Sequence, residues 1–101
     1  MEPRIQYAQT KDGVSIAFWT MGEGMPFVVT PPLGWSHIQM ELQNPLERTW
    51  FERLAERRRL VRYDGRGCGL SARDVTDFSP ESFLLDLEAV VDRLGLERFV
   101  L

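Results

Sequence analysis

The sequence predicts an α/β fold, in which an N-terminal β-hairpin is followed by strand, helix, strand, helix and strand. Near the N-terminus, two apolar segments of strand periodicity flank a glycine turn. From residue 27 onward, short apolar runs alternate with two stretches of helical periodicity. Such alternation is typical of a parallel sheet with helices packed on its faces. The length of 101 residues limits the chain to one domain.

The first two predicted strands, residues 4–9 and 14–19, flank a hairpin turn at Asp12-Gly13. Apolar and polar residues alternate in both strands, with Tyr7 among the apolar positions of the first. This alternation predicts a hairpin with one half-buried face.

The middle of the chain predicts a strand, a loop and a helix. Residues 27–30 form a continuous apolar run, which favours a strand buried on both faces. A loop is expected from residue 31 to about residue 43. The helix then begins with Asn44 as its cap and Pro45 at its first position, and residues 57–59, three arginines, close it. Its apolar positions, expected mostly in the core, are Leu46, Trp50, Phe51 and Leu54.

The last third predicts strand, loop, helix and the start of another strand. Residues 60–63 read as a strand and residues 64–71 as a glycine-rich loop. Ser79 caps the second helix, and Gly95 ends it. One apolar stripe is expected along this helix, formed by Phe83, Leu84, Leu87, Val90, Val91 and Leu94. A final strand is expected to begin at residues 99–101.

Composition excludes several classes of protein. The net charge of −3 argues against a nucleic-acid partner for this segment. With Cys68 as the only cysteine and His37 as the only histidine, neither an intrachain disulfide nor a His/Cys metal cluster is expected. No apolar run approaches the roughly 20 residues that span a bilayer, and the first ten residues lack the apolar region of a signal peptide. A cytoplasmic location without membrane contact is therefore expected.

The loop at residues 64–71 carries the most specific pattern. A dinucleotide-binding loop would need a third glycine where Leu70 stands, and a phosphate-binding P-loop would need Gly-Lys-Ser/Thr. The pattern Asp-x-Arg-Gly-x-Gly-x-Ser after a buried strand, with a capped helix behind it, resembles the corresponding loop of the α/β-hydrolase superfamily. The resemblance covers about residues 4–101 and agrees with the order of the predicted elements.

This resemblance implies that residues 1–101 are a partial α/β-hydrolase domain, the first half of its sheet. In the family, the nucleophile lies on a Gly-x-Ser-x-Gly elbow after the fifth strand, and the acid and histidine follow later. The chain is thus expected to be truncated before the elbow and inactive alone. The parent, meaning the longer chain that would carry this sequence, is expected to be a serine-type hydrolase of small esters, amides or related substrates. No cofactor is implied.

The resemblance also assigns a role to the loop after the third predicted strand, whose backbone supplies one oxyanion donor in the family. Pro31 and Pro32 have no N–H, so the candidate donors here are Gly34 and then Leu33. The His-Gly pair that often occurs in this loop is missing. Trp35 and His37 are candidates for the wall of the substrate pocket, although His37 fits a loop histidine with an ordinary hydrogen bond better.

Structural roles are expected for the remaining residues of the loop at 64–71. Asp64 and Arg66 fit a brace of the loop better than a catalytic pair, with Asp64 accepting hydrogen bonds from loop N–H groups. Gly67, Gly69 and Ser71 are expected to serve turns, and Cys68 is expected to be an unreactive thiol.

A narrower resemblance motivates a second hypothesis. The segments PPLGWSHIQME and RRLVRYDGRGCGLSARD resemble hydrolase-like domains that are fused to bacterial cyclases or transcriptional regulators. The alternative function is therefore a non-catalytic sensor or binding domain joined to a signalling module outside this chain. A self-sufficient interaction protein of this length is a third interpretation.

Overall fold

A four-stranded mixed sheet forms the centre of the computed structural model, which describes residues 3–31, 36–72, 75–76 and 78–99. Its strands are β1 (Gln6–Gln9), β2 (Ser15–Met21), β3 (Met25–Val29) and β4 (Arg58–Tyr63), in the order β1-β2-β4-β3. β2 runs antiparallel to β1 and β4, whereas β3 and β4 are parallel. The predicted hairpin and the parallel pair are thereby confirmed.

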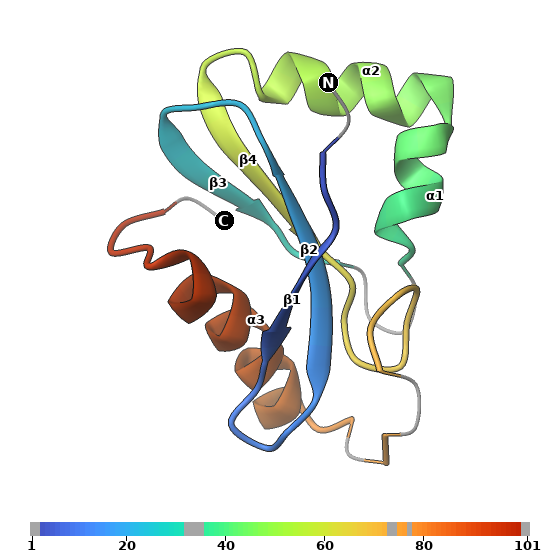
Figure 1. The fold of residues 1–101 in the computed structure, drawn as a ribbon, viewed down its shortest axis with the longest axis vertical. Helices are drawn as coiled ribbons and strands as arrows, with labels where there is room; N and C mark the ends of the chain where they lie inside the picture. Colours follow the sequence, from blue (N-terminus) through green and yellow to red (C-terminus); the bar gives the residue numbers. More distant parts are fainter. Residues whose placement is uncertain (1–2, 32–35, 73–74, 77, 100–101) are drawn as a thin grey trace.

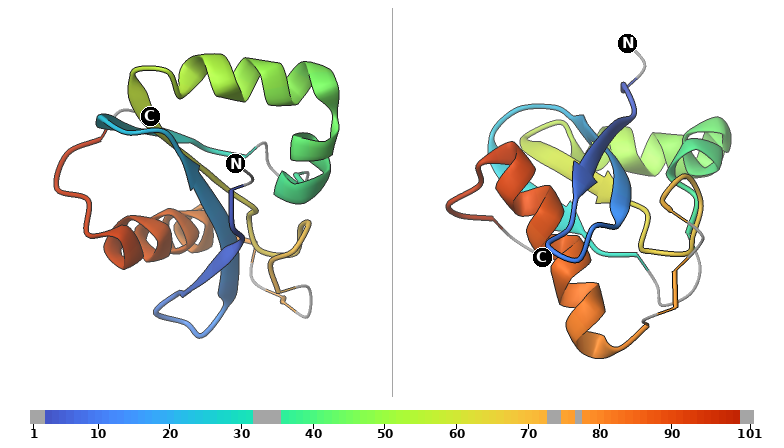
Figure 2. Two further views of the ribbon diagram at one scale, coloured as in Figure 1. Left: turned by 45° about the horizontal axis from the view of Figure 1, so that its top comes forward. Right: turned by 60° about the horizontal axis from the view of Figure 1, so that its bottom comes forward.

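Helices cover both faces of this sheet (Figure 1). α1 (Ile38–Gln43) and α2 (Pro45–Leu54) lie on one face, and α3 (Pro80–Leu94) lies on the other, as the left view of Figure 2 shows. The predicted caps are confirmed: Asn44 Oδ1 accepts from the N–H of Leu46, and the Ser79 side chain accepts from that of Ser82. Gly95 ends α3 in the left-handed conformation, with φ of 66°.

The core has two layers, one on each side of the sheet. The layer toward α3 contains Ala8, Ile16, Phe18, Val28, Val61, Tyr63, Ala89 and Val90. The layer toward α1 and α2 contains Ala17, Trp19, Ile38, Leu42, Phe51, Ala55 and Leu60. In the second layer, the rings of Trp19 and Phe51 meet edge to face with their centroids 5.4 Å apart.

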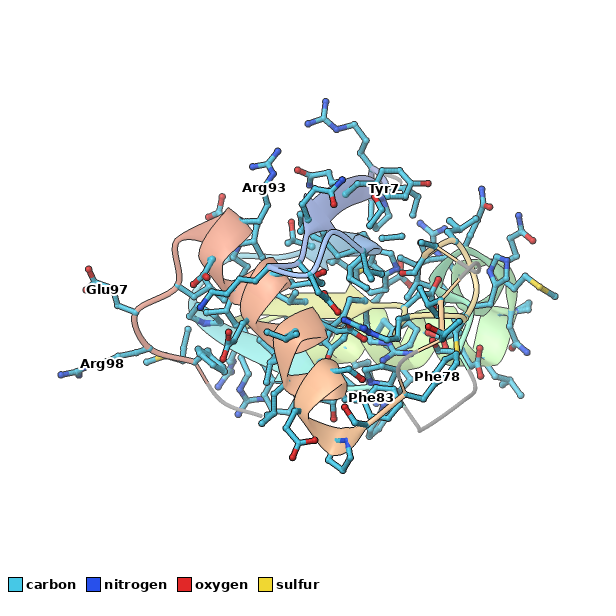
Figure 3. All side chains as sticks on the ribbon, turned by 90° about the horizontal axis from the view of Figure 1, so that it is seen from below. Tyr7, Phe78, Phe83, Arg93, Glu97 and Arg98 are labelled. Atoms are coloured by element: carbon cyan, nitrogen blue, oxygen red, sulfur yellow. The ribbon has the colours of Figure 1, made fainter. Side chains whose placement is uncertain are left out.

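The expectation of one half-buried hairpin face is wrong for β2. Its four residues from Ile16 to Trp19 are fully buried, so both faces of the strand belong to the core. The reason is its place inside the sheet, between β1 and β4 and with helices above and below. In β1 the buried position is Ala8, and Tyr7 projects outward at the edge of the molecule (Figure 3).

The expected loop at residues 31–43 is wrong at its end, because α1 begins at Ile38. His37 caps this helix, and Ile38 and Leu42, one helical turn apart, are its buried residues. Six residues are too few to show helical periodicity in the sequence. The arginines at 57–59 do not close α2 either: that helix ends at Leu54, and β4 already begins at Arg58.

The apolar stripes of the longer helices are narrower than expected. Leu84 is 58% exposed, and the buried positions of α3 are Ser82, Asp86, Ala89 and Val90. In α2 only Phe51 is buried, while Leu46 and Trp50 face outward. At the end of the chain, Phe99 packs against the core but is not in a strand, and residues 100–101 lie outside the described residues.

In the described parts of the chain, no helix combines the length and the apolar character that crossing a membrane requires.

Candidate active-site loops

Two loops leave the carboxyl ends of the parallel neighbours β3 and β4, the edge of an α/β sheet where ligands bind. The first begins at Thr30 and leads to α1, and the second begins at Asp64 and leads to α3. Because β3 and β4 are hydrogen-bonded neighbours, the two loops start side by side. Side chains of the second loop can therefore contact the first.

Asp64 joins the two loops from a fully buried position. Its Oδ1 atom accepts hydrogen bonds from the Ser36 hydroxyl at 2.7 Å and from the Ile38 N–H at 3.0 Å, and both donors lie where the first loop meets α1. Its Oδ2 atom accepts from the N–H of Leu70 at 2.9 Å, within its own loop. Asp64 therefore accepts hydrogen bonds both from its own loop and from the end of the neighbouring one.

Ser71 and Gly69 complete the second loop. The Ser71 hydroxyl donates to the backbone oxygen of Asp64 at 2.6 Å and accepts from the N–H of Ala17 in β2 at 2.9 Å. Gly69 has φ of +49°, and a Cβ atom at this position would lie 2.1 Å from Asp64 Oδ2. Glycine is therefore required at 69 both by the backbone conformation and by the close approach of the carboxyl group.

Arg66 is the centre of a charged network that ties the second loop to α3 and to the hairpin turn. Its Nε atom and its backbone N–H donate to Asp86 at 2.9 and 3.0 Å, and its Nη1 atom donates to Asp12 at 2.8 Å. The side chains of Arg66 and Asp86 are each only 1% exposed. Burial raises the pKa of the Asp86 carboxyl group, and the contacts with Arg66 act in the opposite direction.

A cavity of about 240 Å³ lies between α3 and the carboxyl ends of β3 and β4. Its wall is mainly apolar and includes Thr30, Pro31, Tyr63, Cys68, Phe83 and Leu87. Burial, together with the nearby Asp86, raises the pKa of Tyr63 to about 12, so its phenol stays protonated near neutral pH. Phe78 and Phe83 lie at the end of the molecule where α3 begins (Figure 3).

The structure separates the remaining candidate residues. His37 caps α1, with its Nδ1 atom accepting from the N–H of Met40 at 3.2 Å, and does not line the cavity. Cys68 is half-buried in the cavity wall. The candidate oxyanion donors Leu33 and Gly34, and the candidate pocket residue Trp35, lie outside the described residues, so their roles stay predictions.

Sequence reasoning missed three acidic residues that fix the site. Asp12 was seen only as a turn residue, whereas it also pairs with Arg66. Asp86 is a charged residue on the buried side of an amphipathic helix, which is a signal for a buried ion pair. Glu41 binds Arg62 of β4 through both carboxyl oxygens at 2.6–2.7 Å, and this holds α1 against the sheet. That pair could not be foreseen because α1 was not predicted.

In the described residues, no three His, Cys, Asp or Glu side chains gather where they could hold a metal ion.

The contact between Asp12 and Arg66 predicts a dependence of stability on pH. Hydrogen bonds that Arg66 and Thr10 donate to the Asp12 carboxyl group lower the pKa of Asp12 from 3.8 to about 2. The unfolded chain therefore binds this proton at a higher pH than the folded one, and the stabilisation present above about pH 4 is lost as the pH falls toward 2. We expect Asp12→Asn to be less stable than the wild-type protein at pH 5 and nearly equal to it at pH 2, by urea unfolding. An equal difference in the free energy of unfolding between the two proteins at both pH values would contradict this.

Comparison with known proteins gives structural relatives but no sequence family. No family model and no curated protein matches the chain. An α/β hydrolase from Sphaerobacter thermophilus is similar over 94% of this chain and 34% of its own, with 33% identity and a TM-score of 0.71. An esterase from Rhodococcus sp. is similar over 95% and 34%, with 25% identity and a TM-score of 0.74. The epoxide hydrolase CorEH is similar over 95% and 31%, with 26% identity and a TM-score of 0.76.

Sheet order, loop placement and these neighbours define the class: the chain has the fold of an α/β hydrolase. It spans about a third of the length of the solved structures it matches, and it is an N-terminal portion of that fold.

Proposed function

We propose that this chain is the front portion of a serine-type α/β hydrolase that cleaves small esters, amides or related compounds. One observation carries the proposal: nearly the whole chain superimposes on hydrolases, an esterase among them, at 25–33% identity. The chemistry would be nucleophilic acyl transfer through a covalent intermediate. The chain supplies the first strands of the sheet and the loops at their carboxyl ends, while the nucleophile, acid and base belong to the rest of the parent.

Within this proposal, the backbone N–H groups of Gly34 and Leu33 are the donors that this chain contributes to an oxyanion hole. Support comes from the sequence, in which Pro31 and Pro32 cannot donate and the next N–H groups belong to these residues. Support also comes from the place of the loop, directly after β3 at the ligand-binding edge of the sheet. Trp35 follows in the same loop and is proposed to border the substrate, whereas His37 serves as the cap of α1.

The proposal is tested by reading the coding sequence beyond the codon for Leu101 and assaying the encoded protein. We expect a Gly-x-Ser-x-Gly pattern within a few residues and a histidine much later. The parent should hydrolyse p-nitrophenyl esters, and replacing the elbow serine by alanine should lower kcat by about 10⁴-fold or more. The 101-residue chain should show no turnover, since it contains no such elbow. If the coding sequence beyond Leu101 contained no elbow serine, the proposal would be wrong.

A second candidate function is a non-catalytic sensor or binding domain fused to a signalling or transcription module. It is favoured by the PPLGWSH segment, which resembles hydrolase-like domains fused to signalling modules and lacks the His-Gly pair that often occurs in this loop. The same reading of the coding sequence separates the two functions, because a sensor would have lost the elbow serine or the late histidine. For either function we propose a cytoplasmic location, which a sequence with Cys68 as its one cysteine supports.

A further inference from the structure

The Asp64 carboxyl group forms the direct link between the two loops at the ligand-binding edge of the sheet. Asp64 directly follows β4, and its Oδ1 atom takes one hydrogen bond from a side chain, Ser36, and one from a backbone N–H, that of Ile38. Ser36 lies at the end of the loop that follows β3, and Ile38 is the first residue of α1, where that loop ends. The link joins elements far apart in the sequence and is independent of the strand pairing between β3 and β4.

The surroundings leave the carboxyl group little freedom to move. Its Oδ2 atom is held by the Leu70 N–H, and the backbone of Asp64 is fixed on both sides, because its N–H donates to Ala17 and its carbonyl oxygen accepts from Ser71. Asp64 is fully buried, so water does not compete for these bonds. Because the carboxyl group is held on the rigid sheet, it fixes the positions of the groups that it binds in the neighbouring loop, Ser36 and Ile38.

We propose that Asp64 is a positioning residue for the reaction of the parent, acting through Ser36 and Ile38 on the loop that follows β3. The inference rests on the proposed function, in which that loop contributes backbone donors to the oxyanion hole. Those donors act on the charge that develops in the transition state, and a displacement of about 1 Å can cost on the order of 100-fold in rate. Loosening the end of this loop should therefore slow the chemical step without weakening substrate binding.

The test uses Ser36→Ala and Asp64→Asn in the parent. Ser36→Ala removes one of the two donors to Oδ1. An Asn at 64 has a single oxygen, so it cannot accept both from Leu70 and from the donors of the neighbouring loop. We expect kcat for a p-nitrophenyl ester to fall about tenfold in Ser36→Ala and further in Asp64→Asn, with KM within about twofold of wild type.

Ser82→Ala is the matched control. Ser82 is buried, like Ser36, and its hydroxyl also donates a hydrogen bond, to the backbone oxygen of Ser79, but it lies in α3 and outside the cavity wall. Its kcat should stay within about twofold of wild type. A change in KM alone, or an equal loss of kcat in Ser36→Ala and Ser82→Ala, would overturn the positioning role.

Hydrogen exchange at the Ile38 and Leu70 amides supplies a readout that needs no activity. Both N–H groups donate to Asp64, so the exchange of at least one of them should become at least tenfold faster in Asp64→Asn, and both should remain unchanged in Ser82→Ala. Unchanged exchange of both amides in Asp64→Asn would refute the brace itself. If the wild-type parent hydrolyses no ester, the proposed function fails and the role in catalysis fails with it, whereas faster exchange would still show that Asp64 fixes the loop.

Discussion

Replacing Arg66 by methionine is expected to lower the free energy of unfolding by about 3–5 kcal/mol, which is a large part of the stability of a chain of this size. The substitution keeps a long apolar side chain but removes the cation from Asp86, whose side chain is 1% exposed and whose other contact is a backbone N–H. A buried carboxylate left without its counter-ion is among the most costly defects in a protein core. Urea unfolding at neutral pH measures the loss.

Two further variants separate this effect from loss of packing. In the double variant Arg66→Met with Asp86→Asn, the amide carries no charge and its oxygen can still accept from the backbone N–H of residue 66, so about half of the lost stability should return. Lys11→Met removes a cation from an exposed pair with Glu88 at 3.6 Å and should cost less than about 1 kcal/mol. If the double variant were no more stable than Arg66→Met, unpaired charge would not be the cause.

Gly69→Ala is expected to be nearly as damaging, with a loss of roughly 2–5 kcal/mol. Its φ of +49° disfavours any residue with a side chain, and the new Cβ atom would lie 2.1 Å from Asp64 Oδ2. The carboxyl group cannot move aside without giving up its bonds to Ser36 and Ile38. Thermal unfolding should therefore show a clear drop in Tm.

Gly95→Ala controls for the backbone part of this loss. Gly95 has a similar φ of +66°, but a Cβ atom there would meet nothing within 4 Å. We expect this variant to lose only about 1–2 kcal/mol, the cost of the left-handed conformation alone. Equal losses in the two variants would mean that the contact with Asp64 carries no energy.

Much of the fold could be predicted because its local signals are strong. Asn44 with Pro45, Ser79 with Pro80, and Gly95 mark helix ends through their own chemistry, and the structure uses each as expected. What failed depended on tertiary contacts. α1 is too short for a periodic pattern, and it forms because Ile38 and Leu42 pack under the sheet while Glu41 pairs with Arg62. The outward position of Trp50 likewise follows from how α2 is rotated against β4.

The candidate site was predictable only where a residue acts within its own loop. Asp64, Gly69 and Ser71 lie close together in the sequence, and a glycine-rich turn around an aspartate is typical of a braced loop. The partners of Arg66, in contrast, come from the hairpin turn and from α3. Such a network depends on how distant elements pack, and no spacing in the sequence contains that information.

The position of β2 has a consequence for the order in which the chain folds. One partner, β1, precedes it by a short turn, but the other, β4, is synthesised only after β3 and two helices, with Phe18 opposite Tyr63. Local hairpins form within microseconds, whereas closing a long loop costs more entropy and slows folding. We expect the β1–β2 hairpin to form early and its docking onto β4 to limit the rate. Phe18 also belongs to the core layer toward α3, so a growing chain would leave it uncovered until both β4 and α3 have left the ribosome. Chaperones would be needed most in that interval.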